Sequence, residues 1–125
     1  MQRVKGIGGV FFKAQDKQKL EAWYAQNLGV QMSQYGGSEF HWRDAEGREH
    51  VTAWAIFPHD THYFDPSRSP MMINYLVDDL DAMLAQLKAA GAEIDPKRED
   101  QDYGRFAWVM DPEGNRIELW EPAKE

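Results

Sequence analysis

Cysteine is absent from the 125-residue sequence, so the chain has no disulfide framework, no thiolate nucleophile and no cysteine-built metal site. Long apolar runs are absent too. None approaches the roughly 20 residues of a membrane span, and the N-terminus lacks the apolar core of a signal peptide. We therefore expect no membrane association and a cytoplasmic location.

Positive charge is scarce in this sequence. The 14 lysine and arginine residues are outnumbered by 21 aspartate and glutamate residues, which gives a formal net charge of -7. This balance argues against nucleic acid or an anionic membrane as a partner, and it is compatible with a cationic ligand.

Histidine is also scarce, and two of the four histidines stand in the irregular stretch 58–70, which holds three prolines. His59 and His62 have a spacing that is a weak metal pattern without a helix, and solvated loop histidines are the alternative. The stretch 58–70 itself is either a linker between two halves or a loop that covers something.

What is present indicates one globular domain with an internal repeat. Hydrophobic residues make up 42% of the chain and charged residues 28%, which is ordinary for a soluble protein. A first unit of about residues 4–57 and a second unit of about 71–121 each have the pattern strand, helix, then three strands, with 58–70 as connector. Eight strands are thus expected, at about 4–14, 30–35, 39–43, 49–57, 71–77, 92–97, 104–110 and 116–121.

Two helices are expected, one in each unit. Asp16 is the N-cap of a helix that runs to about Leu28, and Asp78 or Asp79 begins a second helix that ends at Gly91. Two such units would place their sheets side by side, with the helices on one face and the other face concave. The predicted fold class is α+β: two βαβββ units that form a cupped mixed sheet with helices on the outer face.

The end of the chain is its most distinctive stretch. Residues 104–110 and 116–121 alternate with strand period around the turn formers Asp-Pro-Glu-Gly-Asn, so they predict a β-hairpin. In the last strand Arg116, Glu118 and Trp120 share one face. A carboxylate in mid-strand is unusual for a core, which marks this face as a candidate site.

The two βαβββ units and the ending DPEGN-x-x-Glu-Leu resemble the vicinal oxygen chelate superfamily, which includes glyoxalase I, extradiol dioxygenases and the fosfomycin- and bleomycin-resistance proteins. The resemblance implies a metal ligand on the first strand of each half and a Glu on the last strand. The Glu corresponds to Glu118, whereas the other positions fall on Gly9 and Met72. Glycine has no side chain that could bind a metal, and the methionine thioether is a soft ligand that suits Zn²⁺, Mn²⁺ or Mg²⁺ poorly. We therefore expect no metal and no cofactor.

If the apolar faces pack under the helices, the opposite faces line the concavity and supply a small-molecule pocket. The predicted ligand-binding residues are Phe11, Lys13, Trp54, Asn74, Phe106, Trp108, Arg116 and Trp120. Glu118 is the candidate catalytic base, with pairing to Arg116 or Lys13 as its structural alternative. The two tryptophans of the hairpin could instead fill the cup. Adjacent Gly8 and Gly9 imply a close approach to the first strand, and Tyr63 and Tyr103 either close over a ligand or cover apolar surface.

Three functions are compatible with this pattern. The favoured one is a metal-free protein of the glyoxalase and bleomycin-resistance type that binds a small organic molecule in the concave face. The second is a glyoxalase- or lyase-type enzyme with Glu118 as general base or sole recognisable metal ligand, so the sequence leaves open whether the protein is an enzyme. The third is an interaction protein whose cup is filled. The resemblance also implies a homodimer, which the connector allows to form by exchange of halves.

Overall fold

The computed structural model describes residues 1–34 and 36–124. Its strands are β1 (Gly6–Ala14), β2 (Ser38–Arg43), β3 (Glu49–Pro58), β4 (Met71–Leu76), β5 (Glu93–Gln101), β6 (Gly104–Met110) and β7 (Arg116–Pro122). Its helices are α1 (Lys17–Leu28) and α2 (Leu80–Ala89). Neither helix has the length and apolar character needed to cross a membrane, and this holds for the whole described part of the chain.

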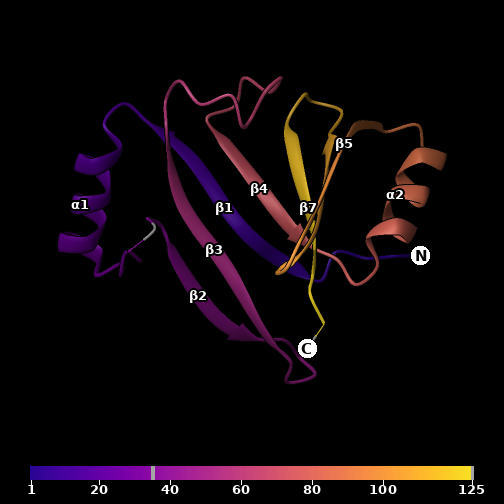
Figure 1. Cartoon of the computed structure of the whole chain (residues 1–125), viewed down its shortest axis with the longest axis horizontal. Coiled ribbons are helices and arrows are strands. Elements are labelled where there is room, and N and C mark those ends of the chain that lie inside the picture. Colours follow the sequence, from indigo (N-terminus) through magenta and orange to yellow (C-terminus); the bar gives the residue numbers. More distant parts are fainter. Residues whose placement is uncertain (35, 125) are drawn as a thin grey trace.

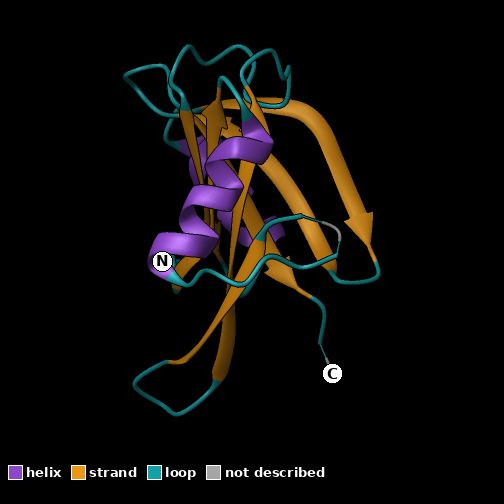
Figure 2. Ribbon diagram, turned by 90° about the vertical axis from the view of Figure 1, so that its left-hand side faces the viewer, coloured by secondary structure: helices purple, strands orange, loops and turns teal. Residues whose placement is uncertain are grey.

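The seven strands form one mixed sheet in the order β2-β3-β1-β4-β7-β6-β5. Within each half the first strand pairs in parallel with the last, β1 with β3 and β4 with β7. The halves join where β1 pairs antiparallel with β4. Figure 1 places α1 and α2 at opposite ends of the molecule with the strands between them, and the side view in Figure 2 shows that the sheet is strongly curved. The predicted α+β, glyoxalase-like fold class is therefore confirmed.

The strand expected at about 30–35 is absent from the residues that the structure describes. Tyr35 lies outside the described residues, and residues 30–34 are not in a strand. A local turn takes up their backbone groups: the Ser33 N–H donates to the Gly37 carbonyl at 2.8 Å, and the Gly36 N–H donates to the Ser33 carbonyl at 3.0 Å. Over the described residues, the first half is therefore βαββ, whereas the second is βαβββ. Alternating apolar residues alone do not make a strand when no neighbour pairs with it.

Strand β5 is longer than predicted and runs to Gln101 through acidic residues that lack strand patterning. Its second part pairs with β6, from Arg98 opposite Ala107 to Gln101 opposite Gly104, after an irregularity in register. Pairing with an adjacent strand therefore outweighs the poor intrinsic preference of the segment.

Both helices begin as predicted. The side chains of Asp16 and Asp79 accept hydrogen bonds at 3.0 Å from the N–H groups of Lys19 and Ala82, respectively. Asp79, rather than Asp78, is therefore the N-cap of α2. Gly29 follows α1 in the left-handed region with φ of 68°, where glycine is favoured.

The core lies between α2 and the strands of the second half. Helix α2 packs on β5, β6 and β7. The buried residues of this cluster are Val77, Leu80, Met83, Ala107, Val109 and Leu119. Ile117 of β7 is partly buried and packs against the same cluster. Helix α1 has no fully buried residue, and it contacts the sheet through an aromatic group in which Tyr24 lies 5.0 Å from Trp54 and 6.0 Å from Phe12, measured between ring centroids.

The internal repeat extends to the chemistry of two turns. In the turn before β3, Asp44 Oδ1 accepts the N–H groups of Glu46 and Arg48 at 2.9 Å. In the turn before β7, Asp111 Oδ1 accepts the N–H groups two and four residues ahead, also at 2.9 Å. The second oxygen of Asp44 contacts His50 Nε2 at 2.8 Å, and this hydrogen bond is the main reason that the pKa of Asp44 is lowered to about 2.

Candidate ligand-binding site

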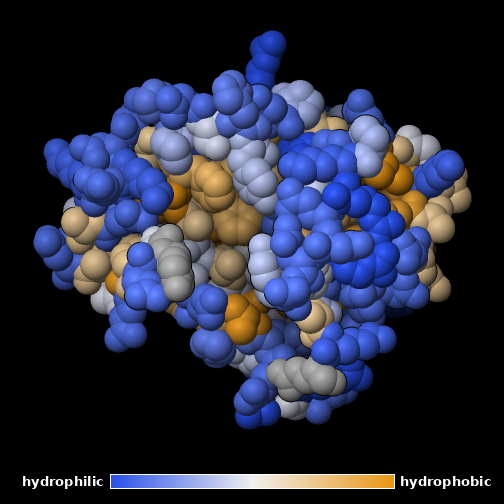
Figure 3. All heavy atoms as spheres, viewed as in Figure 1, coloured by the Kyte–Doolittle hydropathy of each residue, from blue (hydrophilic) through white to orange (hydrophobic). Residues whose placement is uncertain are grey.

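A cavity of about 360 Å³ lies on the sheet face opposite the α2 core. It is lined by residues from β1, β2, β3, β4, β6 and β7, together with the connector and the β5–β6 hairpin: Gly8, Phe11, Glu39, Val51, Ala53, Tyr63, Asn74, Glu99, Tyr103, Phe106, Glu118 and Trp120. Figure 3, in the same view as Figure 1, shows apolar surface in a hollow near the centre of the molecule, with hydrophilic residues around it.

Glu118 forms the floor of the cavity and is only 2% exposed. Asn74 Nδ2 donates to its Oε1 at 2.6 Å, and Trp108 Nε1 donates to its Oε2 at 3.0 Å. The Tyr63 hydroxyl also donates to Oε2. No lysine, arginine or histidine of the described residues forms an ion pair with this carboxylate. The buried carboxylate of Glu118 is therefore held by three uncharged hydrogen-bond donors.

Strand register explains why these groups meet. Asn74 of β4 and Trp108 of β6 are both direct neighbours of Glu118 across the sheet. Side chains directly opposite each other project from the same face, so the three form one row across three strands. The row was predicted to face the concavity: Asn74 and Glu118 line the cavity, whereas Trp108 lies buried beneath it.

The orientation of the Asn74 amide follows from this row. Only its NH₂ group can face the carboxylate, because its carbonyl would be repelled there. Asn74 is 1% exposed, and its Oδ1 has no hydrogen-bond partner in the described part of the chain. This oxygen lies against Gly8: a Cβ at Gly8 would stand 2.2 Å from it. The predicted close approach at the paired glycines is thus explained, since a Cβ at Gly9 would also lie 2.7 Å from the Phe11 ring.

The connector 58–70 covers part of the sheet, which decides between its two predicted roles. Phe64 is fully buried and packs with Met72 and Trp108. Next to it, Tyr63 stacks on Phe57 with centroids 5.4 Å apart and an interplanar angle of 2°. Burial, followed by the negative charge of Glu118 and the hydrogen bond to it, raises the pKa of Tyr63 above its ordinary value. Tyr63 therefore remains a proton donor to the carboxylate.

Aromatic rings form the walls of the cavity. Phe106 stacks on Trp120 with centroids 5.7 Å apart and planes 10° from parallel. Tyr103 meets Phe106 edge to face at 5.6 Å, and its carbonyl accepts the Trp120 Nε1–H at 3.1 Å. Phe11 of β1 also lines the cavity, and its ring meets that of Phe57 edge to face, with centroids 5.7 Å apart. Such walls offer area and stacking to a planar ligand.

Five of the nine predicted site residues therefore line the cavity: Phe11, Asn74, Phe106, Glu118 and Trp120. Trp108 does not line it. The ring of Trp108 is fully buried beneath the site and acts on the cavity through Glu118.

The other three predicted residues lie elsewhere. Lys13 Nζ stands 5.3 Å from the centre of the Phe64 ring, and Arg116 forms an ion pair with Asp95 at 2.8 Å. Neither pairs with Glu118. The predicted orientation of Trp54 is corrected, because its ring packs with Tyr24 of α1 on the helix-covered face. The parallel register places Trp54 beside Val10 rather than beside Phe11.

Four lining residues had been assigned no place in the site by the sequence: Glu39, Val51, Ala53 and Glu99. Side chains alternate along β3, so Val51 and Ala53 face the side of the sheet opposite to Trp54. Because Trp54 was assigned to the concave face, Val51 and Ala53 were assigned to the other face. Glu39 and Glu99 come from the two edge strands, and only the curvature of the sheet brings those edges toward the centre. No local pattern in the sequence marks them.

The residues around Glu118 do not fit a divalent metal ion. All three of its neighbours present a hydrogen rather than a lone pair to the carboxylate. Met72, at a position where the resemblance implies a ligand, is 1% exposed and packs in the cluster with Phe64 and Trp108. Among the described residues, no three His, Asp or Glu side chains are grouped as a metal would require.

The curved sheet and its concave cavity define a glyoxalase-like protein. The sequence model of the Glyoxalase/Bleomycin resistance protein/Dioxygenase superfamily matches residues 6–119, so the chain belongs to this superfamily. None of the curated proteins matches the sequence.

Three solved structures illustrate the similarity. A variant of methylmalonyl-CoA epimerase from Streptomyces coelicolor, in complex with 2-nitronate-propionyl-CoA, is 13% identical with a TM-score of 0.68, over 98% of this chain and 100% of that one. Methylmalonyl-CoA epimerase from Mycobacterium tuberculosis is 20% identical with a TM-score of 0.60, over 97% and 90%. The Mn(II)-bound glyoxalase from Novosphingobium aromaticivorans is 21% identical with a TM-score of 0.59, over 99% and 41%. At these identities the likeness concerns the fold alone.

Proposed function

We propose that this chain binds a small organic molecule in the concave cavity and that binding requires neither a metal nor a cofactor. The observation that carries this proposal is a cavity of about 360 Å³ with aromatic walls and a fixed polar floor. Its volume and its few convergent polar groups are typical of small-molecule sites. The bleomycin-resistance branch of the superfamily offers a model of such binding without chemistry.

The open cavity also weighs against the reading in which side chains fill the cup. The two tryptophans that could have filled it lie elsewhere: Trp120 stacks on Phe106, and Trp108 is buried in the cluster with Phe64 and Met72. The space between Phe11 and this stacked pair is left for a ligand.

Native mass spectrometry of the freshly purified protein tests the proposal directly. We expect a co-purified mass, or a hit from a small-molecule screen, whose binding falls at least tenfold in Trp120→Ala because a cavity wall is lost. Trp23→Ala is the matched control, since Trp23 is 51% exposed on α1 and does not line the cavity. Equal loss in both variants, or no binding in either assay, would contradict the proposal.

A second candidate function is enzymatic, with Glu118 as general base. Its support is that Oε1 accepts one hydrogen bond, from Asn74, and so retains a lone pair on a residue that lines the cavity. Incubation of an identified ligand in D₂O would test it. Incorporation of deuterium into a carbon-bound position of the ligand with the wild-type protein, and none with Glu118→Gln, would favour the enzyme over simple binding.

We also propose that the protein is a cytoplasmic homodimer, as the superfamily resemblance implies. Strands β2 and β5 are the two ends of the sheet, and the edge of an end strand is where a second copy could add its own strand. Light scattering tests the stoichiometry, and a monomer at micromolar concentration would contradict it.

A further inference from the structure

We infer that the ligand carries a positively charged group with N–H donors, such as a primary or secondary ammonium or an amidinium, attached to an apolar body. This inference rests on the proposed function, because it names the class of molecule that the same cavity takes. It is argued from the charges of the lining, from the two unused acceptors on its floor and from its walls.

The charges of the cavity lining are all negative. Glu39, Glu99 and Glu118 line the cavity, and no lysine, arginine or histidine is among the lining residues that the structure describes. Lys97 lies 3.2 Å from Glu99, but at 55% side-chain exposure it is well solvated. Carboxylates on low-dielectric walls concentrate cations at the site and repel anions.

Glu118 is a buried charge without a buried countercharge. Charged side chains are rarely fully buried unless they are paired. Arg116, the other buried charged residue near this face, follows the rule through its 2.8 Å contact with Asp95. Glu118 has neutral donors only. A cationic group in the cavity would supply the missing partner.

The polar groups with unused capacity on the cavity floor are acceptors. Asn74 Oδ1 is buried without a partner, and Glu118 Oε1 accepts one hydrogen bond where a carboxylate oxygen can accept two. Buried acceptors without partners are rare and call for a donor. A ligand N–H group meets this need, whereas a quaternary ammonium would bring charge without a donor.

The walls suit the same ligand. Phe11, Phe106 and Trp120 present ring faces and edges to the cavity. Aromatic faces attract a cation through the ring quadrupole, most strongly for tryptophan, and they bury an apolar body.

Matched probes separate charge from shape. Calorimetry would compare 2-phenylethylamine, 2-phenylethanol and phenylacetate, and in parallel tryptamine, tryptophol and indole-3-acetate, at pH 7, where both amines are cations. We expect the amine to bind at least tenfold more tightly than the alcohol in one or both series, and the acid to bind most weakly. Trimethylation of the better amine should weaken its binding several-fold, because the N–H donors are lost.

A second experiment removes the negative charge of the two glutamates that the edge strands β2 and β5 contribute to the cavity lining. Glu99→Gln and Glu39→Gln should each weaken amine binding about two- to fivefold and leave alcohol binding unchanged. Glu113→Gln is the matched control, since it removes the same charge from an exposed turn outside the cavity. Both target residues are at least partly exposed, so the variants should fold.

The outcomes distinguish this inference from the function on which it rests. If alcohols bind as tightly as amines and Trp120→Ala abolishes both, the cavity is a binding site but the charge inference is overturned. The same holds if the acids bind best. If no probe binds and no mass co-purifies, both fail.

Discussion

Trp108 is the residue whose role differs most between sequence and structure. The sequence places it on a cavity wall, where truncation would reduce affinity and leave the fold intact. In the structure its ring is fully buried with Phe64 and Met72, and its Nε1 donates to Glu118. We therefore expect Trp108→Ala to lower the free energy of unfolding by about 3–5 kcal/mol.

Urea unfolding followed by circular dichroism measures this effect. The control is Trp23→Ala, which changes an exposed ring on α1 and should shift stability by no more than about 0.5 kcal/mol. A small effect of Trp108→Ala, combined with lost ligand binding, would return Trp108 to the cavity wall.

Tyr63 connects the irregular connector to the site through a single hydroxyl. Tyr63→Phe keeps the stacking on Phe57 and removes a donor to the Glu118 carboxylate. Hydrogen bonds to charged groups contribute more than neutral ones, so the expected loss of stability is about 1–3 kcal/mol at pH 7. Tyr103→Phe is the control, because Tyr103 is 62% exposed and no described residue bonds to its hydroxyl.

The same variant makes an alkaline prediction. The pKa of Tyr63 is raised in the folded protein, first by burial and then by Glu118, above the ordinary value of 10.0. A group whose pKa is higher in the folded than in the unfolded protein stabilises the fold fully at pH values below its unfolded-state pKa. This stabilisation is lost as the pH rises above that unfolded-state pKa. Between the wild-type protein and Tyr63→Phe, the difference in free energy of unfolding should shrink by about 1.4 kcal/mol per pH unit above pH 10. If this difference in free energy of unfolding stays constant above pH 10, the conclusion that the Tyr63 hydroxyl is a buried donor to Glu118 is wrong.

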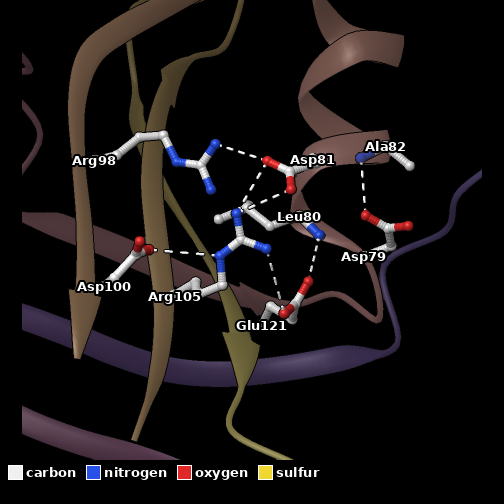
Figure 4. Close-up of polar contacts among 8 residues, drawn as sticks. All are labelled: Asp79, Leu80, Asp81, Ala82, Arg98, Asp100, Arg105 and Glu121. Carbon is white, nitrogen blue, oxygen red and sulfur yellow. Dashed lines mark hydrogen bonds and ion pairs between the residues drawn. The ribbon is translucent and has the colours of Figure 1, made fainter. Parts of the chain in front are cut away.

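At the scale of elements, a charged cluster fastens α2 to the sheet (Figure 4). Asp81, in the first turn of α2, accepts hydrogen bonds from Arg98 of β5 at 2.7 Å and from Arg105 of β6 at 2.9 Å. From β7, Glu121 Oε1 accepts the Leu80 N–H at 2.8 Å. Side chains of three strands thus meet the N-terminus of one helix, where negative charge is favoured.

The cluster predicts an acid dependence. The hydrogen bonds from Arg98 and then Arg105 hold the pKa of Asp81 below its ordinary value of 3.8. A group whose pKa is lower in the folded than in the unfolded protein stabilises the fold at pH values above its unfolded-state pKa. This stabilisation is lost as the pH falls through its folded-state pKa. Asp81→Asn should therefore lower the thermal midpoint at pH 7 and have a smaller effect near pH 2.5.

Asp102→Asn serves as the comparison for this acid dependence, since Asp102 is an exposed acid in the turn between β5 and β6 without an ion pair to any described residue. If both variants lose the same amount at pH 7 and at pH 2.5, the cluster contributes nothing specific. High salt should reduce the Asp81→Asn effect, because exposed ion pairs are screened.

The elements show which parts of the fold can be predicted from sequence. Periodicity and caps suffice for both helices and the final hairpin, because those signals are local. Residues 30–34 and the second part of β5 could not be assigned, because whether they pair depends on a neighbouring strand. The face of Trp54 depends on the register of β3 against β1, which is a long-range property.

At the scale of the whole molecule, the site belongs to neither half alone. Gly8 and Phe11 come from the first half, Asn74 and Glu118 from the second, and Tyr63 from the connector between them. The row across β4, β7 and β6 could be derived from strand parity within one half. The carboxylates of the two edge strands and the cover formed by the connector could not, because they require the curvature of the complete sheet.

The convergence of both halves also leads to a metal prediction. As purified, the protein should contain less than about 0.1 equivalent of Zn²⁺, Mn²⁺, Ni²⁺ or Fe²⁺. Glu118 faces the donors of Asn74, Trp108 and Tyr63, whereas Met72 packs among aromatic rings, so carboxylate and amide oxygens do not converge on one point.

Elemental analysis of untagged protein, purified without chelator, tests this prediction, and a second measurement after dialysis against each metal followed by metal-free buffer shows whether the site can be loaded. The control is Glu118→Gln, which keeps the shape of the side chain and removes its charge. One metal per chain in the wild-type protein and none in the variant would show that Asn74 or Tyr63 turns its oxygen toward the ion and that the hydrogen-bonded row is rearranged. Because such an ion would neutralise Glu118, it would also weaken amine binding, whereas a metal-free site should bind amines equally with and without EDTA.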